Sequence, residues 1–596
     1  MKKIIIFLGI FALIFSSCQD LIDPAEQNFR DVSQFSYQPD FAAGVLLYAY
    51  RNIPGYYNDS DYATDDAVTN NLTNNYLRIA TGAWAADNNP MSRWNDGYAA
   101  ILHINLFLEQ IDNILFVKSN EDANKLTQVR MKGEAYGLRA LHLYYLLRTH
   151  AGYAEDGTLL GVPLITEFQD VNADFNQPRA KFEDCVQQIY KDLDLADEYL
   201  PWEYNDIATN DSVQIPAKFK TITTNSGVYN RVMGKISRQL FNGLIASAIR
   251  SKVSLLAASE AFSSPSNLEK WAKAANDASQ VINSVNGVTG LASNGLTFYA
   301  NQTEINGLTE SMNPPEMIWR EDKGDNTDRE RDHFPPSLSG TGRMNPTQNL
   351  VNAFPMANGY PITDAINSGF DPANPYANRD PRLDLYIIHD GSAITGAINT
   401  TIRTGSASGT NDALNHSSGN STRTGYFMKK NLRFYINRTP GSVTTGQSRY
   451  IPRIRFTEIF LNYAEAANEA WGPTGNGSNS YSAYDVIKAI RKRAGVGTNN
   501  GDPYLEDCKN DKAKMRELIR NERRLELCFE SFRFWDIRRW KLSLTEPATG
   551  VNVSVSYSPI SVEVRNYQDY MHYGPIPYSE VMKFSNLLQN KGWSNK

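Results

Sequence analysis

LIRNERRLELCFESFRFWDIRRW, from Leu518 to Trp540, is the stretch that indicates most about how this chain folds. Leu518, Leu525, Phe529 and Phe532 recur at spacings of seven, four and three residues, which predicts a helix with one apolar face. Arginine and glutamate fill many of the other positions. Because charges at this density need partners when they are buried, we expect the helix to contact several neighbouring elements.

Three glutamates in this stretch have two competing interpretations. Glu522, Glu526 and Glu530 stand four residues apart and would share one strip of a helix. Such carboxylates could bind a metal or serve as the acid and base of a helical glycoside hydrolase. Arginine could instead pair with them bidentately and link neighbouring elements. We favour this scaffold role, a charged clamp, because arginine outnumbers glutamate here and no Glu-x-x-His motif is present.

Length and charge limit the class of protein. The chain has 596 residues, with 41% hydrophobic and 21% charged residues, as in ordinary soluble proteins. This length exceeds the size at which a single core stops growing, so we expect several cores or one repetitive array. The net charge of -6 argues against a nucleic acid as partner, because binding phosphates needs a basic surface.

The N-terminus predicts a location. Two lysines precede the mainly apolar segment Ile4 to Phe15, which is too short to cross a bilayer but suits a signal peptide. This segment ends on Ser-Ser-Cys, like a bacterial lipoprotein signal, so residues 1–17 would be removed and Cys18 acylated. An ordinary signal peptide is the alternative. Asp20 and Asp23 resemble signals that send some lipoproteins to the cell surface, which favours an outer-membrane anchor facing the exterior.

Apolar periodicity predicts helices in the first half of the chain and again near its end. The expected helices cover residues 41–50, 101–116, 131–148, 182–200, 234–261, 268–285, 456–470 and 484–494. Residues 203–233 are polar and are expected to form a loop. Helix pairs of about 34 residues suggest stacking like that of tetratricopeptide repeats.

The predicted fold class is therefore mainly α, with tetratricopeptide-like helix pairs as a scaffold. Residues 18–290 form its N-terminal helical part. A loop-rich, irregular module at 291–450 is inserted, since glycine, asparagine, serine, threonine and proline dominate there. Residues 451–596 form a C-terminal helical part and a non-helical tail, which pack on the same scaffold.

Six further motifs follow one another in a fixed order after Cys18. They are RWNDGYAAILHINLFLEQID (93–112), KGEAYGLRALHLYYLLRTHAG (132–152), NPTQNLVNAF (345–354), NRDPR (378–382), RFTEIFLNYAEAANEA (455–470) and IRKRAGV (490–496). With the lipoprotein signal and the 518–540 stretch, they resemble the SusD/RagB family of outer-membrane nutrient-binding lipoproteins, the SusD-like proteins of starch-utilisation systems. The resemblance covers almost the whole chain after the signal.

This resemblance implies a tetratricopeptide-rich α fold with an irregular ligand-binding face and no catalysis. It also implies a partner, a SusC-like TonB-dependent transporter barrel over which such proteins resemble lids. The expected function is that of a cell-surface lipoprotein for polysaccharide utilisation, which captures a glycan and delivers it to the transporter for nutrient uptake. Two alternatives stay open: an oligopeptide-binding member of the same family, and a helical glycoside hydrolase that uses Glu522, Glu526 and Glu530.

Enzyme and metal motifs give little support to other functions. The sequence contains no HExxH, GxSxG or CxxC motif and no phosphate-binding P-loop. Asp59, Asp61 and Asp65 partly match the spacing of a calcium-binding EF-hand, but Thr64 stands where that loop needs glycine. We therefore predict no cofactor, and a structural calcium ion in this loop stays open as an alternative to a solvated acidic turn.

The first candidate for ligand binding is the polar loop 58–96. Sugars are bound by stacking on aromatic rings, while amides and charged groups bond their hydroxyls. We predict Trp84 and Tyr76 as stacking platforms, with Asn74 and Asn88 as hydrogen-bonding partners. The alternative is that Trp84 packs into the scaffold.

A second candidate lies in the long loop after Trp319. There Phe334 could stack on a sugar while Arg331 bonds its hydroxyls. Alternatively, the two residues only hold the loop together.

Overall fold

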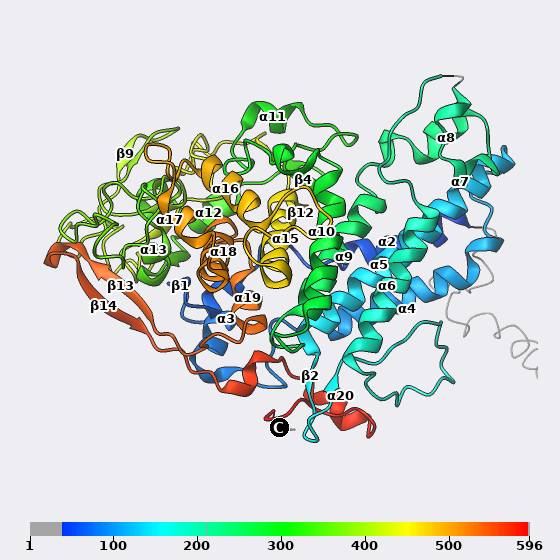
Figure 1. Cartoon of the computed structure of the whole chain (residues 1–596), viewed down its shortest axis with the longest axis horizontal. Coiled ribbons are helices and arrows are strands. Elements are labelled where there is room, and N and C mark those ends of the chain that lie inside the picture. The colour runs from blue at the N-terminus through cyan, green and yellow to red at the C-terminus, as the bar shows by residue number, and fades with distance from the viewer. Residues whose placement is uncertain (1–37, 210, 594–596) are drawn as a thin grey trace, which may run out of the picture.

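The structure is a computed structural model, and it describes residues 38–209 and 211–593 (Figure 1). The predicted signal segment 1–17 and Cys18 lie outside the described residues. The longest helices are α2 (Pro39–Arg51), α4 (Trp94–Gln110), α5 (Glu121–His150), α6 (Phe182–Tyr199), α9 (Gly243–Ala258), α10 (Leu268–Asn283), α15 (Phe456–Trp471), α16 (Ala483–Ala494) and α18 (Lys512–Glu526). All eight ranges predicted as helical overlap one of these helices, and the mainly α fold class is confirmed.

The long helices pack in a continuous series. α2 contacts α4, α4 contacts α5, α5 contacts α6, α6 contacts α9, and α9 contacts α10. α10 then contacts α15, which also contacts α16 and α18. One large hydrophobic core lies between these helices. Figure 1 shows the array on one side of the molecule and the irregular chain on the other. Contacts mainly between neighbours are typical of a helical-repeat scaffold, as predicted.

Local sequence fixes the ends and the spacing of these helices. Asn120 caps the start of α5, where its side chain accepts a hydrogen bond from the Ala123 backbone N–H at 2.7 Å. Gly495 ends α16 in the left-handed region, with φ of 84°. At Gly137 on α5, an added Cβ would lie 2.1 Å from the ring of Phe241, so glycine allows this close packing.

The remaining helices are short. They are α3 (Asn75–Arg78), α7 (Ala217–Lys220), α8 (Ser226–Met233), α11 (Gln302–Gly307), α12 (Asp328–His333), α13 (Gln348–Ala353), α14 (Arg382–Tyr386), α17 (Pro503–Cys508), α19 (Arg533–Arg539) and α20 (Tyr578–Lys583). Two sequence predictions are wrong here. The loop predicted at 203–233 contains α7 and α8, and the helix predicted from residue 234 begins at Gly243, which Asn242 caps. Short polar helices escape detection because they lack a long apolar pattern.

The strands pair two by two and tie the irregular chain to the scaffold. They are β1 (Ala67–Thr69), β2 (Gly152–Tyr153), β3 (Leu159–Leu160), β4 (Met317–Arg320), β5 (Gly324–Asp325), β6 (Met344–Pro346), β7 (Ile387–Ile388), β8 (Ala393–Ile394), β9 (Thr400–Thr401), β10 (Phe427–Met428), β11 (Ser448–Arg449), β12 (Pro452–Arg455), β13 (Ala548–Asn552) and β14 (Ser558–Glu563). β1 pairs with β6 and β4 with β12, both antiparallel. The tail forms the hairpin β13–β14. The prediction that the tail is non-helical is wrong at α20, which is a short helix.

The stretch 518–540 is not one helix, contrary to the prediction. α18 ends at Glu526, an irregular turn follows, and α19 begins at Arg533. Within the turn, Phe529 and Ser531 adopt left-handed backbone conformations with φ of 61° and 67°. The side chain of Lys430 holds this turn, since its ammonium donates hydrogen bonds to the carbonyl oxygens of α18 and the turn at 2.7 and 3.2 Å.

The break lets one short stretch contribute to three hydrophobic clusters. Leu518 and Ile519 lie in the core of the helical array. Leu525 and Phe529 lie in a second cluster, formed mostly by the irregular chain. Phe534 lies in a third cluster beneath the N-terminal loop. A straight helix presents one apolar face, so the turn is what joins the three clusters.

Buried ion pairs around the three glutamates confirm the predicted scaffold role. We call Glu522, Glu526, Glu530 and their basic partners the glutamate clamp. Glu522 accepts hydrogen bonds from Arg382 and Arg491 at 2.8 and 2.7 Å, and Glu526 accepts from Arg382 and Arg493 at 3.0 and 2.8 Å. Glu530 accepts from Lys430 at 2.6 Å and from Arg455 at 2.8 Å. All three carboxylates have 0% exposure, so the clamp joins α18, α14, α16 and β12 from within.

Candidate functional site

Trp84 is a core residue, so its predicted role as a stacking platform is wrong. Its side chain is 5% exposed, and its ring meets the edges or faces of Phe534, Tyr567 and Trp593 at centroid distances of 5.8, 6.0 and 5.0 Å. The indole N–H donates a hydrogen bond to Asn89 at 3.2 Å. A sugar ring therefore cannot stack on Trp84. The alternative prediction, that Trp84 packs into the scaffold, is confirmed.

The other predicted residues of loop 58–96 mainly support local structure. Asn74 caps α3 through the Tyr76 backbone N–H at 2.9 Å and donates to Asp59 at 2.7 Å. Asn88 donates to the Ala83 carbonyl at 2.7 Å. Tyr76 is partly exposed, and its hydroxyl donates to a backbone carbonyl at 3.2 Å. Ligand contacts of these three residues stay predictions.

The second predicted pair is divided between core and surface. Phe334 is 2% exposed and stacks on Phe434, with ring centroids 5.2 Å apart, so its predicted role as a platform is wrong. Arg331 is exposed on α12 and pairs with Asp328 and Asp332 at 2.5 and 2.9 Å. Ligand binding by Arg331 stays a prediction.

The acidic residues of the same loop are engaged by the 518–540 stretch. Asp65 pairs with Arg524 at 3.0 Å and with Arg533 at 2.8 Å. Burial would raise the pKa of Asp65, but these two guanidinium groups outweigh burial and hold it below its usual range. Burial and neighbouring Asp66 raise the pKa of Asp61 to about 7. Within the described residues, no group of three or more histidine, cysteine, aspartate or glutamate side chains is arranged to hold a metal ion.

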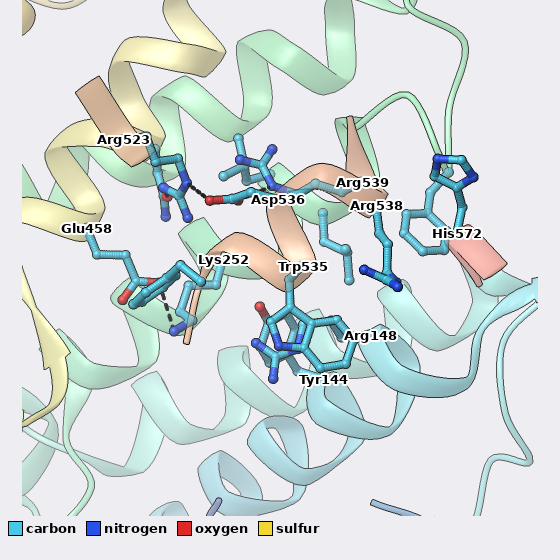
Figure 2. Close-up of a pocket in the computed structure, with 15 residues that line it drawn as sticks. Tyr144, Arg148, Lys252, Glu458, Arg523, Trp535, Asp536, Arg538, Arg539 and His572 are labelled. Carbon is cyan, nitrogen blue, oxygen red and sulfur yellow. Dashed lines mark hydrogen bonds and ion pairs between the residues drawn. The ribbon is translucent and has the colours of Figure 1, made fainter. Parts of the chain in front are cut away.

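The structure places a different candidate site between the helical array and the turn after α18. Two neighbouring cavities of about 50 and 60 Å³ share Arg148, Lys252, Phe532 and Trp535 in their linings, and we call them together the Trp535 cleft. α5 supplies Arg148, α9 supplies Lys252, and α19 supplies Trp535. Figure 2 shows Trp535 projecting toward Arg148, with Lys252 and Glu458 to one side.

Aromatic rings dominate one side of the cleft. Tyr56, Tyr145, Phe532 and Trp535 line it, and each is partly exposed. The Tyr56 hydroxyl donates a hydrogen bond to Glu530 at 2.6 Å, so the clamp borders the cleft directly. Partly exposed rings beside polar side chains are the combination that binds sugars through their apolar faces and hydroxyls.

The basic side chains of the cleft differ in their partners. Lys252 pairs with Glu458 at 2.8 Å, and this carboxylate raises the pKa of Lys252 although burial alone would lower it. Arg148 instead lies over Trp535, with its guanidinium carbon 4.2 Å from the ring centroid, and 5.0 Å from that of Tyr145. These are cation–π contacts, which leave the in-plane N–H donors of the guanidinium unused.

Backbone strain lies at the rim of the cleft. Ser531 lines it and, like Phe529 two residues earlier, adopts the left-handed conformation, which costs about 1–2 kcal/mol for each residue. The Ser531 hydroxyl accepts a hydrogen bond from the Asn58 backbone N–H at 2.8 Å, which helps to hold the turn. Strain that the surrounding structure maintains is concentrated at functional sites.

Sequence reasoning missed this cleft. Both Trp535 and Arg148 stand within ranges that are predicted to be helical, 518–540 and 131–148, where the apolar pattern indicates packing and not ligand binding. One signal was present: Arg148 follows Tyr144 and Tyr145 at helical spacing on the same face. That spacing puts a cation beside two aromatic rings.

Two models of known protein families match this chain, one in its first half and one in its second half. The model of the SusD family matches residues 315–593. A second model, described as starch-binding and associating with the outer membrane, matches residues 42–214. The two ranges together span about three quarters of the sequence. The chain belongs to the SusD family. The glutamate clamp lies within the first matched range, and α5 lies within the second.

Solved structures of the SusD family have the same fold. A SusD-like protein from Bacteroides fragilis is 22% identical, covering 96% of this chain and 100% of that chain with a TM-score of 0.70. A SusD-like carbohydrate-binding protein from the same species is 20% identical, covering 93% of this chain and 99% of that chain with a TM-score of 0.66. A laminarin-binding SusD-like protein is 18% identical with a TM-score of 0.54, covering 93% and 99%. At these identities the likeness shows the fold.

One curated relative matches a shorter segment. SusD-like protein P2 from Formosa agariphila is 31% identical over 149 residues, which is 24% of this chain and 25% of that protein. The match therefore spans a quarter of the relative's own length.

Proposed function

We propose that this SusD family member is a non-catalytic glycan-binding protein of the cell surface. The observation that carries the proposal is the Trp535 cleft, where partly exposed aromatic rings stand beside arginine and lysine side chains. Relatives of the same fold support it, since their names describe carbohydrate or laminarin binding. The ligand is an oligosaccharide or polysaccharide that contacts the exposed parts of Tyr145 and Trp535.

The state of Glu522 and Glu530 supports binding without hydrolysis. A general acid of a glycoside hydrolase needs a raised pKa and access to the glycosidic oxygen. Burial would raise the pKa of Glu522, but Arg382 and Arg491 outweigh burial and lower it. Arg455 and Lys430 lower the pKa of Glu530 in the same way. Carboxylates that are buried, ionised and paired are poorly suited to catalysis.

The anchor and the partner are also part of the proposal. Acylated Cys18 holds the protein on the outer membrane, facing the exterior, and a SusC-like TonB-dependent transporter receives the glycan. The description of the second family model, which includes association with the outer membrane, supports this location. In the described part of the chain, no helix combines the length and the apolarity that crossing a membrane requires.

Titration of the purified protein against a panel of glycans tests the binding function. We expect calorimetric binding to at least one glycan, with no reducing ends released during long incubation. Binding of oligopeptides together with failure of every glycan would favour the oligopeptide-binding alternative. Release of sugar ends that disappears in Glu526→Gln would favour the hydrolase.

Replacement of Cys18 tests the anchor. We expect Cys18→Ala to move the protein from the membrane fraction to the soluble fraction, because acyl chains supply the membrane affinity. Immunoblots of separated fractions measure this, with Cys185→Ala as a control that removes a buried thiol elsewhere. Retention of Cys18→Ala in the outer membrane would contradict the lipoprotein assignment.

A further inference from the structure

Charges around the Trp535 cleft are not balanced. Basic residues outnumber acidic ones in its lining: Arg148, Lys252, Arg453, Arg523, Arg538 and Arg539 against Glu458, Glu530 and Asp536. Each of the three carboxylates already has a basic partner, at 2.8 Å for Glu458, 2.6 Å for Glu530 and 2.8 Å for Asp536. The excess charge of the cleft is therefore positive.

Arg148 carries the clearest part of this excess. Its guanidinium lies in cation–π contact with Trp535 and Tyr145, and no carboxylate of the described chain pairs with it. Its Nε atom is buried and has no hydrogen-bond partner. A buried donor without a partner destabilises the free protein, and an acceptor on a bound ligand would remove this penalty.

Two further arginines on either side are similarly underused. Arg453 meets its carboxylate, Glu321, only at 3.9 Å, and its Nη1 atom is buried without a partner. Arg538 donates to backbone carbonyls and lies among aromatic rings, and its Nη2 atom also lacks a partner. Arg453 lines one cavity, Arg538 lines the other, and Arg148 lines both.

We propose that the Trp535 cleft is a subsite for a negatively charged group of the glycan, with Arg148 as its main contact. The group is the carboxylate of a uronic acid or the sulfate ester of a sulfated sugar, since both are small planar or tetrahedral anions with several acceptor oxygens. The proposal rests on the proposed function and narrows the ligand to acidic glycans.

The size and chemistry of the cleft suit such a group. A water needs about 10–15 Å³ of cavity space, so the second cavity, at about 60 Å³, holds a group of roughly four or five heavy atoms. Arginine binds carboxylate and sulfate-like oxygens through paired N–H donors. Arg148 is already held by its contacts with Tyr145 and Trp535, so little side-chain freedom is lost on binding.

Calorimetry with matched oligosaccharides tests the subsite. The probes are an oligouronate, a sulfated oligosaccharide and a neutral oligosaccharide of equal length, with the full-length protein in detergent. We expect an acidic probe to bind at least about tenfold more tightly than the neutral one, as expected for hydrogen bonds to a charged group. The two acidic probes distinguish a carboxylate subsite from a sulfate subsite. Equal affinity for all three probes would overturn the subsite and leave glycan binding intact.

Variants of the arginines assign the preference to the cleft. Arg148→Gln should abolish the preference for the acidic probe, and Arg148→Lys should keep part of it. Arg231→Gln, which removes an exposed arginine from α8, is the matched control and should change nothing. If Arg148→Gln does not fold by circular dichroism, Arg453→Gln replaces it. If the folded arginine variant still binds the acidic probe more tightly than the neutral one, the proposal is overturned.

Inorganic sulfate separates the subsite from the proposed function. Sodium sulfate should quench the tryptophan fluorescence of the protein more than sodium chloride of equal ionic strength, because Trp535 lies against Arg148. Arg148→Gln should lose this difference. If no glycan binds but sulfate quenches in this way, the anion subsite stands and glycan binding fails. If sulfate and chloride act alike, the subsite fails.

Discussion

The glutamate clamp and the Trp535 cleft meet at the turn after α18, yet the basic side chains of the two regions have different partners. In the clamp, every carboxylate is buried and has two basic partners. In the cleft, Arg148 has aromatic rings for neighbours and no carboxylate. Glu530 belongs to the clamp and also lines the cleft, and it stands only five residues before Trp535.

This difference separates scaffold from site more clearly than composition does. Paired charges hold elements in place, and their removal leaves an uncompensated charge in the interior. Unpaired donors at a cleft have a cost in the free protein and gain partners when a ligand binds. In this protein, a dense cluster of paired charges indicates the scaffold, and arginine donors without a hydrogen-bond partner indicate the candidate site.

The largest expected effect is on the clamp. Glu526→Ala should lower the free energy of unfolding by about 3–5 kcal/mol, because it leaves Arg382 and Arg493 without this carboxylate in a buried position. Denaturant unfolding followed by circular dichroism measures the loss. Glu517→Ala, on the exposed face of α18, is the control. A change below about 1 kcal/mol in Glu526→Ala, or weaker ligand binding by the fully folded variant, would contradict a purely structural clamp.

Acid should weaken a second buried pair. Burial would raise the pKa of Glu465, but Arg539 outweighs it and lowers the pKa from 4.5 to about 2. Because the folded-state pKa is the lower one, the stabilisation is complete above about pH 4.5 and is lost as the pH falls toward 2. The shift corresponds to about 3 kcal/mol.

Unfolding of the protein and of Glu465→Gln between about pH 6 and pH 3 measures this contribution. The stability difference between the two should shrink as the pH falls, since protonation makes the glutamate resemble glutamine. A difference that stays constant would show that the ionised form contributes nothing specific.

The smallest expected effect is a change in ligand affinity, and it distinguishes two tryptophans. Trp84→Ala should cost about 3–5 kcal/mol of stability, because the side chain is buried, and should leave glycan affinity unchanged. Trp535→Ala should cost less stability and should weaken glycan binding about two- to tenfold through loss of stacking. Chemical unfolding measures the stability of both variants, and calorimetry measures their glycan affinity. If Trp84→Ala weakens glycan binding and Trp535→Ala does not, the binding site lies in loop 58–96.

Much of the scaffold was predictable because apolar spacing reports helices directly. The helices over 182–200 and 456–470 follow from their residue pattern, and the structure has them within a few residues. The break after Glu526 was not predictable in this way. It depends on Lys430, almost a hundred residues earlier in the chain, which holds the carbonyl groups of the turn.

The candidate site was less predictable for a related reason. Loop 58–96 contains tryptophan, tyrosine and asparagine, a composition suited to sugar binding, but composition does not reveal exposure. Trp84 is covered by Phe534 and Trp593, which stand hundreds of residues later in the chain. Trp535 is partly exposed, and the neighbour over its ring is Arg148 from α5. Both outcomes are fixed by distant partners.

The ion pairs between the N-terminal loop and the end of the chain impose an order on folding. Arg524 bonds Asp66 across 458 residues, so the loop that carries Asp66 lacks this partner until nearly the whole polypeptide has been made. Contacts of such long range are slow to form, and chains of this size fold through partly structured intermediates. The helical array can assemble early from neighbouring segments. A premature stop before residue 518 would therefore leave an assembled array with two unfinished clusters and the exposed apolar surface that leads to aggregation.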